Sequence, residues 1–134
     1  MLSAVTKTSH GDGILEFLDR RLHALAAHLA IIESMDPIEF LQHWYRAQVN
    51  GEWEHARGVT IETLDNPGWR VTIDLVETTL EGVPMASVRR EKSAQDWLVC
   101  EVERDRFLGN GDSRKLLPIL QVFQSWAEES GKVK

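Results

Sequence analysis

The sequence predicts an α+β fold: a mainly antiparallel sheet of four to five strands, N-terminal helices, and a C-terminal helix packed against the sheet. Two observations support this prediction. Apolar residues recur at steps of three and four toward both ends of the chain, which is typical of amphipathic helices. Between the helices, short runs of alternating apolar and polar residues are separated by the turn signals Asn50-Gly51, Gly58 and Asn66-Pro67-Gly68, which is typical of strands.

The first predicted helix covers residues 14–34, with Asp12 as a candidate cap. His23 and His28 lie five residues apart on it. Two metal ligands on one helix face need a spacing of about three or four, so we interpret both histidines as surface residues. Met35 then precedes a complete helix-start signal. We therefore predict an N-terminal extension over residues 1–34, with one amphipathic helix, and a single domain over residues 35–134.

The second predicted helix begins at Asp36. Its carboxylate can cap the helix, Pro37 suits the first helical position, and Glu39 stands where a capping box places it. Apolar residues including Trp44 follow at helical spacing, and the pattern ends at Asn50-Gly51.

The predicted strands cover residues 59–64, 70–75, 86–91 and 97–104. The first two form a hairpin, in which Pro67-Gly68 predicts a type II turn because glycine tolerates the positive φ at its third position. Gly109-Asn110-Gly111 predicts a further turn. A final helix then starts at Asp112 or Ser113 and runs to about Glu129.

Cys100 lies on the same strand face as Leu98 and Val102, which predicts a small hydrophobic core residue. As the single cysteine, it cannot form an internal disulfide or anchor zinc alone, and a reducing cytoplasm is the expected compartment. The first residues lack the pattern of a secretory signal, and no apolar run approaches the roughly 20 residues that a membrane helix needs.

The net charge of −6 comes from 21 acidic and 15 basic residues. This balance argues against general nucleic-acid binding, because phosphates require basic patches. It suits a basic protein partner, although mild acidity also keeps a protein soluble.

The best acid–base candidate is His55 with Glu54 or Asp65. Adjacent residues on an extended segment point to opposite faces, so Glu54 and His55 are not expected to cooperate there. The chain also lacks the motifs of a strained nucleophile turn, a phosphate-binding loop or a helical pair of metal ligands. We therefore predict no catalytic residue, cofactor or metal site.

The five tryptophans divide into two groups. Trp44 and Trp126 lie on apolar helical stripes and are predicted core residues. Trp53, Trp69 and Trp97 lie in or beside loops near polar residues, where an indole can pack its ring and still offer its N–H outward. These three suit a semi-buried structural role or an interface.

Several of these residues form motifs that resemble the immunity protein 53 family, presumed antidotes in bacterial polymorphic toxin systems. The resemblance covers roughly residues 36–129, and residues 1–34 fall outside it. Ala56-Arg57 departs from the family pattern, in which an aromatic usually precedes the glycine. The motifs are Trp44-Tyr45, the GEWEH run at 51–55, Gly58, the IETLDNPGW run at 61–69, Ile73-Asp74-Leu75, and Asp96-Trp97 with Cys100.

The resemblance implies a protein that binds its cognate toxin domain and neutralises it without catalysis. The negative charge suggests that this toxin is basic. A small hydrolase or nuclease-like enzyme using His55, and an interaction module with a non-toxin partner, remain open alternatives. The candidate partner-binding residues are Trp53, Glu54, His55, Asp65, Asn66, Trp69, Asp96 and Trp97. For the first six, the alternative interpretation is that they join the hairpin to the helix.

Overall fold

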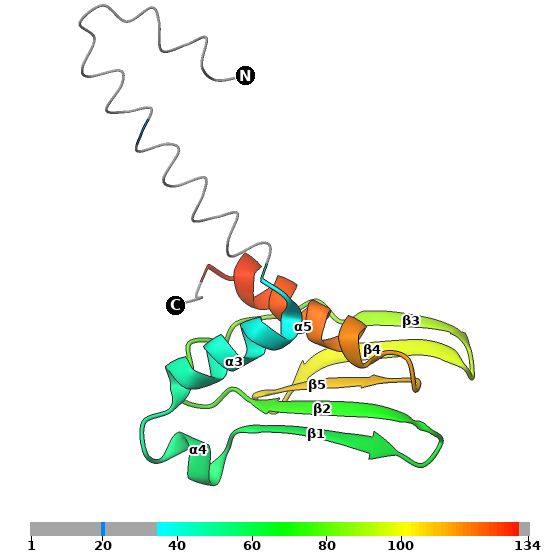
Figure 1. The fold of residues 1–134 in the computed structure, drawn as a ribbon, viewed down its shortest axis with the longest axis horizontal. Helices are drawn as coiled ribbons and strands as arrows, with labels where there is room; N and C mark the ends of the chain where they lie inside the picture. The colour runs from blue at the N-terminus through cyan, green and yellow to red at the C-terminus, as the bar shows by residue number, and fades with distance from the viewer. Residues whose placement is uncertain (1–19, 21–34, 132–134) are drawn as a thin grey trace, which may run out of the picture. The chain divides into compact units, whose positions relative to one another are not determined.

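The computed structural model describes Arg20 and residues 35–131. Residues 36–131 form an α+β domain with helices on one face of a five-stranded antiparallel sheet (Figure 1). The predicted fold class is confirmed. The predicted helix over residues 14–34, with Asp12, His23 and His28, lies outside the described residues apart from Arg20. The division at residue 35 stays a prediction. Among the described residues, no helix is long and apolar enough to cross a membrane.

The sheet has the strand order β1-β2-β5-β4-β3, and all its pairings are antiparallel. β1 and β3 are therefore the two outermost strands, and β5, the last strand in the sequence, lies at the centre. The strands are β1 (Val59–Leu64), β2 (Gly68–Asp74), β3 (Val88–Ser93), β4 (Asp96–Glu103) and β5 (Arg106–Gly111).

The helices start where local chemistry supports them. The helix α3 (Pro37–Gln48) is capped by Asp36, whose Oδ1 accepts hydrogen bonds from the backbone N–H of Ile38 at 2.8 Å and of Glu39 at 3.1 Å. This cap confirms the predicted helix start. The helix α5 (Leu116–Glu129) starts later than the predicted Asp112 or Ser113.

The core lies between these helices and the sheet. Phe123 of α5 stands at its centre, with ring centroids 5.2 Å from both Trp44 of α3 and Phe107 of β5. Edge-to-face packing of this kind favours a fixed arrangement of the rings. Trp44, Trp126 and Cys100 are all buried, which confirms their predicted places in the core.

The predicted turn at Gly109-Asn110-Gly111 is wrong, because these residues form the end of β5. Glycine is present here because α5 approaches the backbone of β5 closely. A Cβ on Gly109 would lie 2.3 Å from Cγ2 of Ile119 on α5, so the missing side chain lets the helix pack on the central strand.

Two further local predictions are corrected. The type II turn at Pro67-Gly68 is wrong, because Gly68 is not among the glycines with positive φ and instead begins β2 beside the backbone of Gly111. The preceding Asn66–Pro67 peptide is cis. The segment around Glu54, expected to be extended, forms the short helix α4 (Trp53–Ala56).

Candidate functional site

The structure places the eight candidate residues at opposite ends of the sheet. Trp53, Glu54 and His55 lie on α4, just before the start of β1. The other five lie at the far end, where the β1–β2 turn, the start of β4 and the loop before α5 meet. The register brings them there, because Trp69 and Leu98 both pair with Gly111 of the central strand.

At the α4 end, Trp53 is a core residue. Its side chain is 1% exposed, and its ring centroid lies 5.9 Å from that of Trp44 and 5.7 Å from that of Tyr45. The indole therefore joins α4 to α3 through aromatic packing. A role of Trp53 in partner binding stays a prediction.

Glu54 closes the turn that precedes α4. Its carboxylate accepts hydrogen bonds from the backbone N–H of Asn50 at 3.0 Å and of Gly51 at 2.7 Å. Asn50 in turn accepts from the backbone N–H of Glu52 and of Trp53, both at 2.9 Å. Backbone N–H groups, first its own and then those of Asn50 and Gly51, lower the pKa of Glu54 against an opposing effect of burial. This arrangement explains Asn50-Gly51 and Glu54 as parts of one turn.

His55 is exposed, and the structure does not bring Asp65 to it. His55 precedes the first residue of β1 and Asp65 follows the last, so the strand between them separates the two by about 20 Å at about 3.3 Å per residue. Glu54 is already bonded to the turn. Among the described residues, no three His, Cys, Asp or Glu side chains form a group that could hold a metal ion.

Cys100 is buried, and the low polarity around it raises the pKa of its thiol to about 12. A thiol with so high a pKa is almost fully protonated at neutral pH and is a poor nucleophile.

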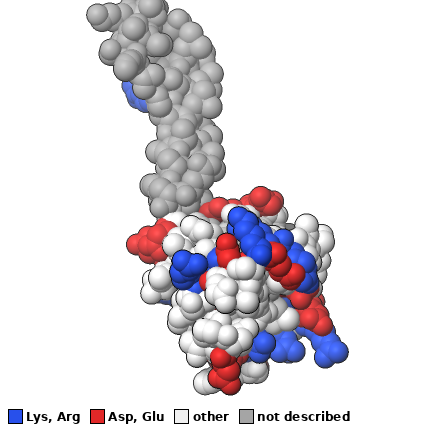
Figure 2. Space-filling model, turned by 90° about the vertical axis from the view of Figure 1, so that its right-hand side faces the viewer, with Lys and Arg blue, Asp and Glu red and all other residues white. Residues whose placement is uncertain are grey.

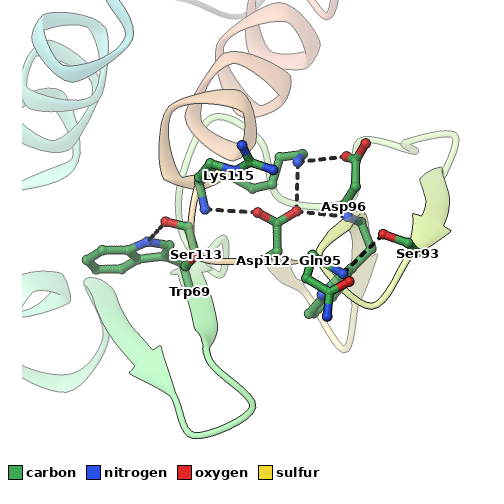
Figure 3. Close-up of polar contacts among 9 residues, drawn as sticks. Trp69, Ser93, Gln95, Asp96, Asp112, Ser113 and Lys115 are labelled. Carbon is green, nitrogen blue, oxygen red and sulfur yellow. Dashed lines mark hydrogen bonds and ion pairs between the residues drawn. The ribbon is translucent and has the colours of Figure 1, made fainter.

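At the far end, a polar cluster of Asp96, Asp112 and Lys115 joins the start of β4 to the loop between β5 and α5 (Figure 3). The Nζ of Lys115 donates to Oδ1 of Asp96 at 2.9 Å and to Oδ2 of Asp112 at 2.7 Å. Asp112, only 3% exposed, also accepts from the backbone N–H of Trp97 at 2.8 Å and of Arg114 at 2.9 Å. The cluster fixes the start of β4 against the loop that leads into α5.

The charges of this cluster stabilise one another. Burial raises the pKa of Asp112, but the hydrogen bonds from Lys115, Arg114 and Trp97 more than offset it and lower the pKa to about 2. The hydrogen bond from Lys115 also lowers the pKa of Asp96, and Asp112 and Asp96 raise the pKa of Lys115.

Sequence reasoning placed Asp96 in the candidate site but missed Lys115, and it treated Asp112 only as a helix start. The i,i+3 spacing of Asp112 and Lys115 is a sequence signal for that pair. No local pattern connects either residue to Asp96, which the fold alone brings to them.

The two other tryptophans of the candidate set are half-buried at this end and belong to opposite faces of the sheet. The Nε1–H of Trp69 donates to the backbone oxygen of Ser113 at 3.0 Å on the helix side. Trp97 alternates with the buried Leu98 and therefore points to the other face. Asp65 and Asn66 are exposed in the β1–β2 turn. Seen end-on, this part of the domain carries acidic and basic side chains intermixed with uncharged surface (Figure 2).

A groove of about 360 Å³ lies elsewhere, between α5 and both β3 and the chain that leads into β3. Its lining includes Met85, Val88, Arg90, Val122 and Trp126, and none of the eight candidate residues.

Residues 38–128 match the model of a family described as immunity protein 53. The matched stretch contains all five strands, α4, and nearly all of α3 and α5. No curated protein and no solved structure matches the chain.

Proposed function

Because the chain belongs to the immunity protein 53 family, we propose that it binds a cognate toxin domain and neutralises it by direct one-to-one association. The family match carries this proposal, since it spans almost the whole described domain. Binding either blocks the active site of the toxin or holds the toxin in an inactive form. We place this association in the reducing cytoplasm of the cell that makes the protein.

The physical character of the domain supports this role. Tight association is favoured by a rigid surface, because less conformational entropy is lost on binding. The aromatic core around Phe123 holds α3 and α5 on the sheet, and the polar cluster of Asp96, Asp112 and Lys115 holds the loop before α5 against the start of β4. With a net charge of −6, the protein complements a basic toxin.

Co-expression with a toxin tests the proposal. The probe is the C-terminal domain of the large secreted protein that we expect to be encoded next to this gene. Expression of that domain alone should stop growth, and co-expression with this protein should restore growth and allow the two to be purified together. Toxicity that persists despite equal expression of both proteins would contradict the proposal.

His55→Ala is the control for an enzymatic mechanism. Because His55 is exposed, its replacement should leave the fold unchanged. Neutralisation by binding needs no catalytic residue, so a variant that still binds the toxin domain should also restore growth. A variant that still binds the toxin domain but no longer restores growth would favour the enzyme alternative.

A further inference from the structure

The two edges of the sheet are protected very differently. An edge strand exposes unpaired backbone groups, and proteins usually blunt it with charged side chains or a bulge. β3 has both: Arg89-Arg90-Glu91-Lys92 lies within it, and its register with β4 shifts between Glu91 and Ser93. β1 has the sequence VTIETL with a single charge, at Glu62, and pairs with β2 without a register shift. The β1 edge is thus the one open to strand pairing.

Apolar side chains adjoin this open edge. Ile61 of β1 is 42% exposed, and it lies diagonally across from Trp69, because Ile61 pairs with Val71 and Thr63 with Trp69. Both side chains point to the helix side of the sheet.

Leu117 is a further exposed apolar residue, close in the chain to the bond that holds Trp69. The indole of Trp69 is bonded to Ser113, and Leu117, 50% exposed, follows four residues later in the first turn of α5. We call Ile61, Trp69 and Leu117 the hairpin strip. Single exposed apolar residues are ordinary on protein surfaces, but a strip beside an unprotected edge is a feature of interaction sites.

Charge indicates which partner covers the strip. Glu62 and Asp65 are exposed on the same hairpin. Glu62 alternates with Ile61 and therefore points away from the helices, opposite Arg70 of β2, whose Nε donates to Asn110. Within the described part of the chain, neither Glu62 nor Asp65 forms an ion pair. β1 contains no Lys or Arg, so pairing of β1 with β1 of a second copy offers these carboxylates no opposite charge in cross-strand positions. A partner with basic groups would meet them favourably.

We infer that the toxin docks on the outer edge of β1 and on the hairpin strip, with an apolar contact over Ile61 and Leu117 on the helix side and with Lys or Arg side chains that reach Asp65 in the turn and, around the edge of the sheet, Glu62. This inference rests on the proposed function. The free backbone groups of β1 are also available to pair with an extended segment of the toxin.

Four lysine substitutions, which add the same charge at different places, test the surface. Ile61→Lys and Leu117→Lys lie in the strip, whereas Ile38→Lys replaces a 57% exposed residue of α3 and Ser125→Lys lies in the groove beside β3. Calorimetric titration with the toxin domain encoded beside this gene should show affinity at least about tenfold weaker for each strip variant. Both controls should stay within about threefold of wild type.

The outcomes separate the two proposals. If the wild-type protein does not bind the toxin domain, the proposed function fails and this inference falls with it. If the wild type binds and both strip variants bind equally well, or if Ser125→Lys is the variant that loses affinity, the toxin docks elsewhere. Light scattering tests whether a second copy of this chain binds β1 instead. If the wild-type protein is a dimer and Ile61→Lys is a monomer, β1 is the dimer interface. Thermal melting shows that each variant is folded, and Leu117→Lys tests the strip independently of the strand.

Discussion

Asp112 is an acidic residue that the fold holds in its charged form. Its carboxylate is buried, yet it accepts hydrogen bonds from Lys115 and from two backbone N–H groups. Such a group stabilises the native state only while it is ionised, because the protonated form gives up part of this hydrogen bonding.

Replacement of Asp112 by asparagine should therefore destabilise the domain. Asparagine nearly conserves the volume but removes the charge opposite Lys115, so we expect the free energy of unfolding at neutral pH to fall by about 2 to 3 kcal/mol. Asp105→Asn is the matched control: Asp105 is exposed with a φ of 58°, a conformation that asparagine tolerates, and its replacement should change the stability by less than about 0.5 kcal/mol. Urea unfolding measures both.

Acid provides a second measurement on the same pair of proteins. The pKa of Asp112 in the folded state, about 2, lies below its ordinary value of 3.8, so the unfolded state takes up the proton first as the pH falls. The contribution of Asp112 is thus complete above about pH 4 and is lost as the pH approaches 2. The stability difference between wild type and Asp112→Asn should shrink across this window, and a constant difference would show that ionisation of Asp112 is not the source.

For contacts of single residues, local sequence rules predicted correctly those in which the two interacting groups are close in the chain. The cap at Asp36 was predictable because the N–H groups it binds are two and three residues away. Burial of Cys100 followed from the alternation of its strand. The bond between Lys115 and Asp96 spans 19 residues, and only the sheet register determines it.

Among the elements, β5 shows how glycine can mislead a reading of the sequence. The run Gly109-Asn110-Gly111 contains typical turn residues, but two strands and a helix crowd around it. Its glycines make room for Ile119 and Lys115 of the α5 region rather than for positive φ. A single sequence contains no local sign of this crowding, so β5 was not predicted as a strand. The predicted number of four to five strands nevertheless includes the five observed.

Gly109→Ala tests the close packing of α5 on β5. The new methyl group would overlap Cγ2 of Ile119, whose β-branched side chain has little rotamer freedom in a helix, so we expect a loss of about 1 to 3 kcal/mol. Ile119→Ala alone should cost about 2 to 5 kcal/mol by leaving a cavity. The double variant should lose at least about 0.5 kcal/mol less than the two single losses combined, because the inserted methyl partly fills that cavity. Additive losses in urea unfolding would contradict this packing.

For the whole molecule, hydrophobic periodicity was sufficient for the fold class, and the motifs at 51–55 and 61–69 were sufficient for the family. The candidate site was less predictable from the sequence than the fold class and the family were. Trp53 and Glu54 are unusual residues for a loop, and in the structure they stabilise that loop. Ile61 and Leu117 instead lie among the ordinary apolar residues of a strand and a helix, and the sequence pattern does not mark them as exposed. Exposure of an apolar residue depends on which elements cover it, and periodicity alone does not contain that information.

Net charge is also a property of the whole molecule, and it predicts how association depends on salt. If the toxin is basic, the association rate constant should fall by about tenfold or more between 20 mM and 500 mM NaCl, because the screening length shortens from about 20 Å to about 4 Å. The dissociation rate constant should change less, since contacts in the strip are mainly apolar. Stopped-flow measurements with the toxin domain give both constants, and an association rate constant independent of salt would exclude steering by opposite charge.

The strand order β1-β2-β5-β4-β3 also has a consequence for how the chain folds. The hairpin β1–β2 and the meander β3–β4–β5 each pair neighbours in sequence, so their loops close at little entropic cost. Only the junction between β2 and β5 joins distant residues, such as Arg70 and Asn110, which are 40 positions apart. α5 packs on β2, β5 and β4 and thus spans this junction. The largest loop-closure cost in the sheet is therefore that of pairing β2 with β5, which joins the hairpin to the meander. α5 stabilises this pairing because it packs on both parts.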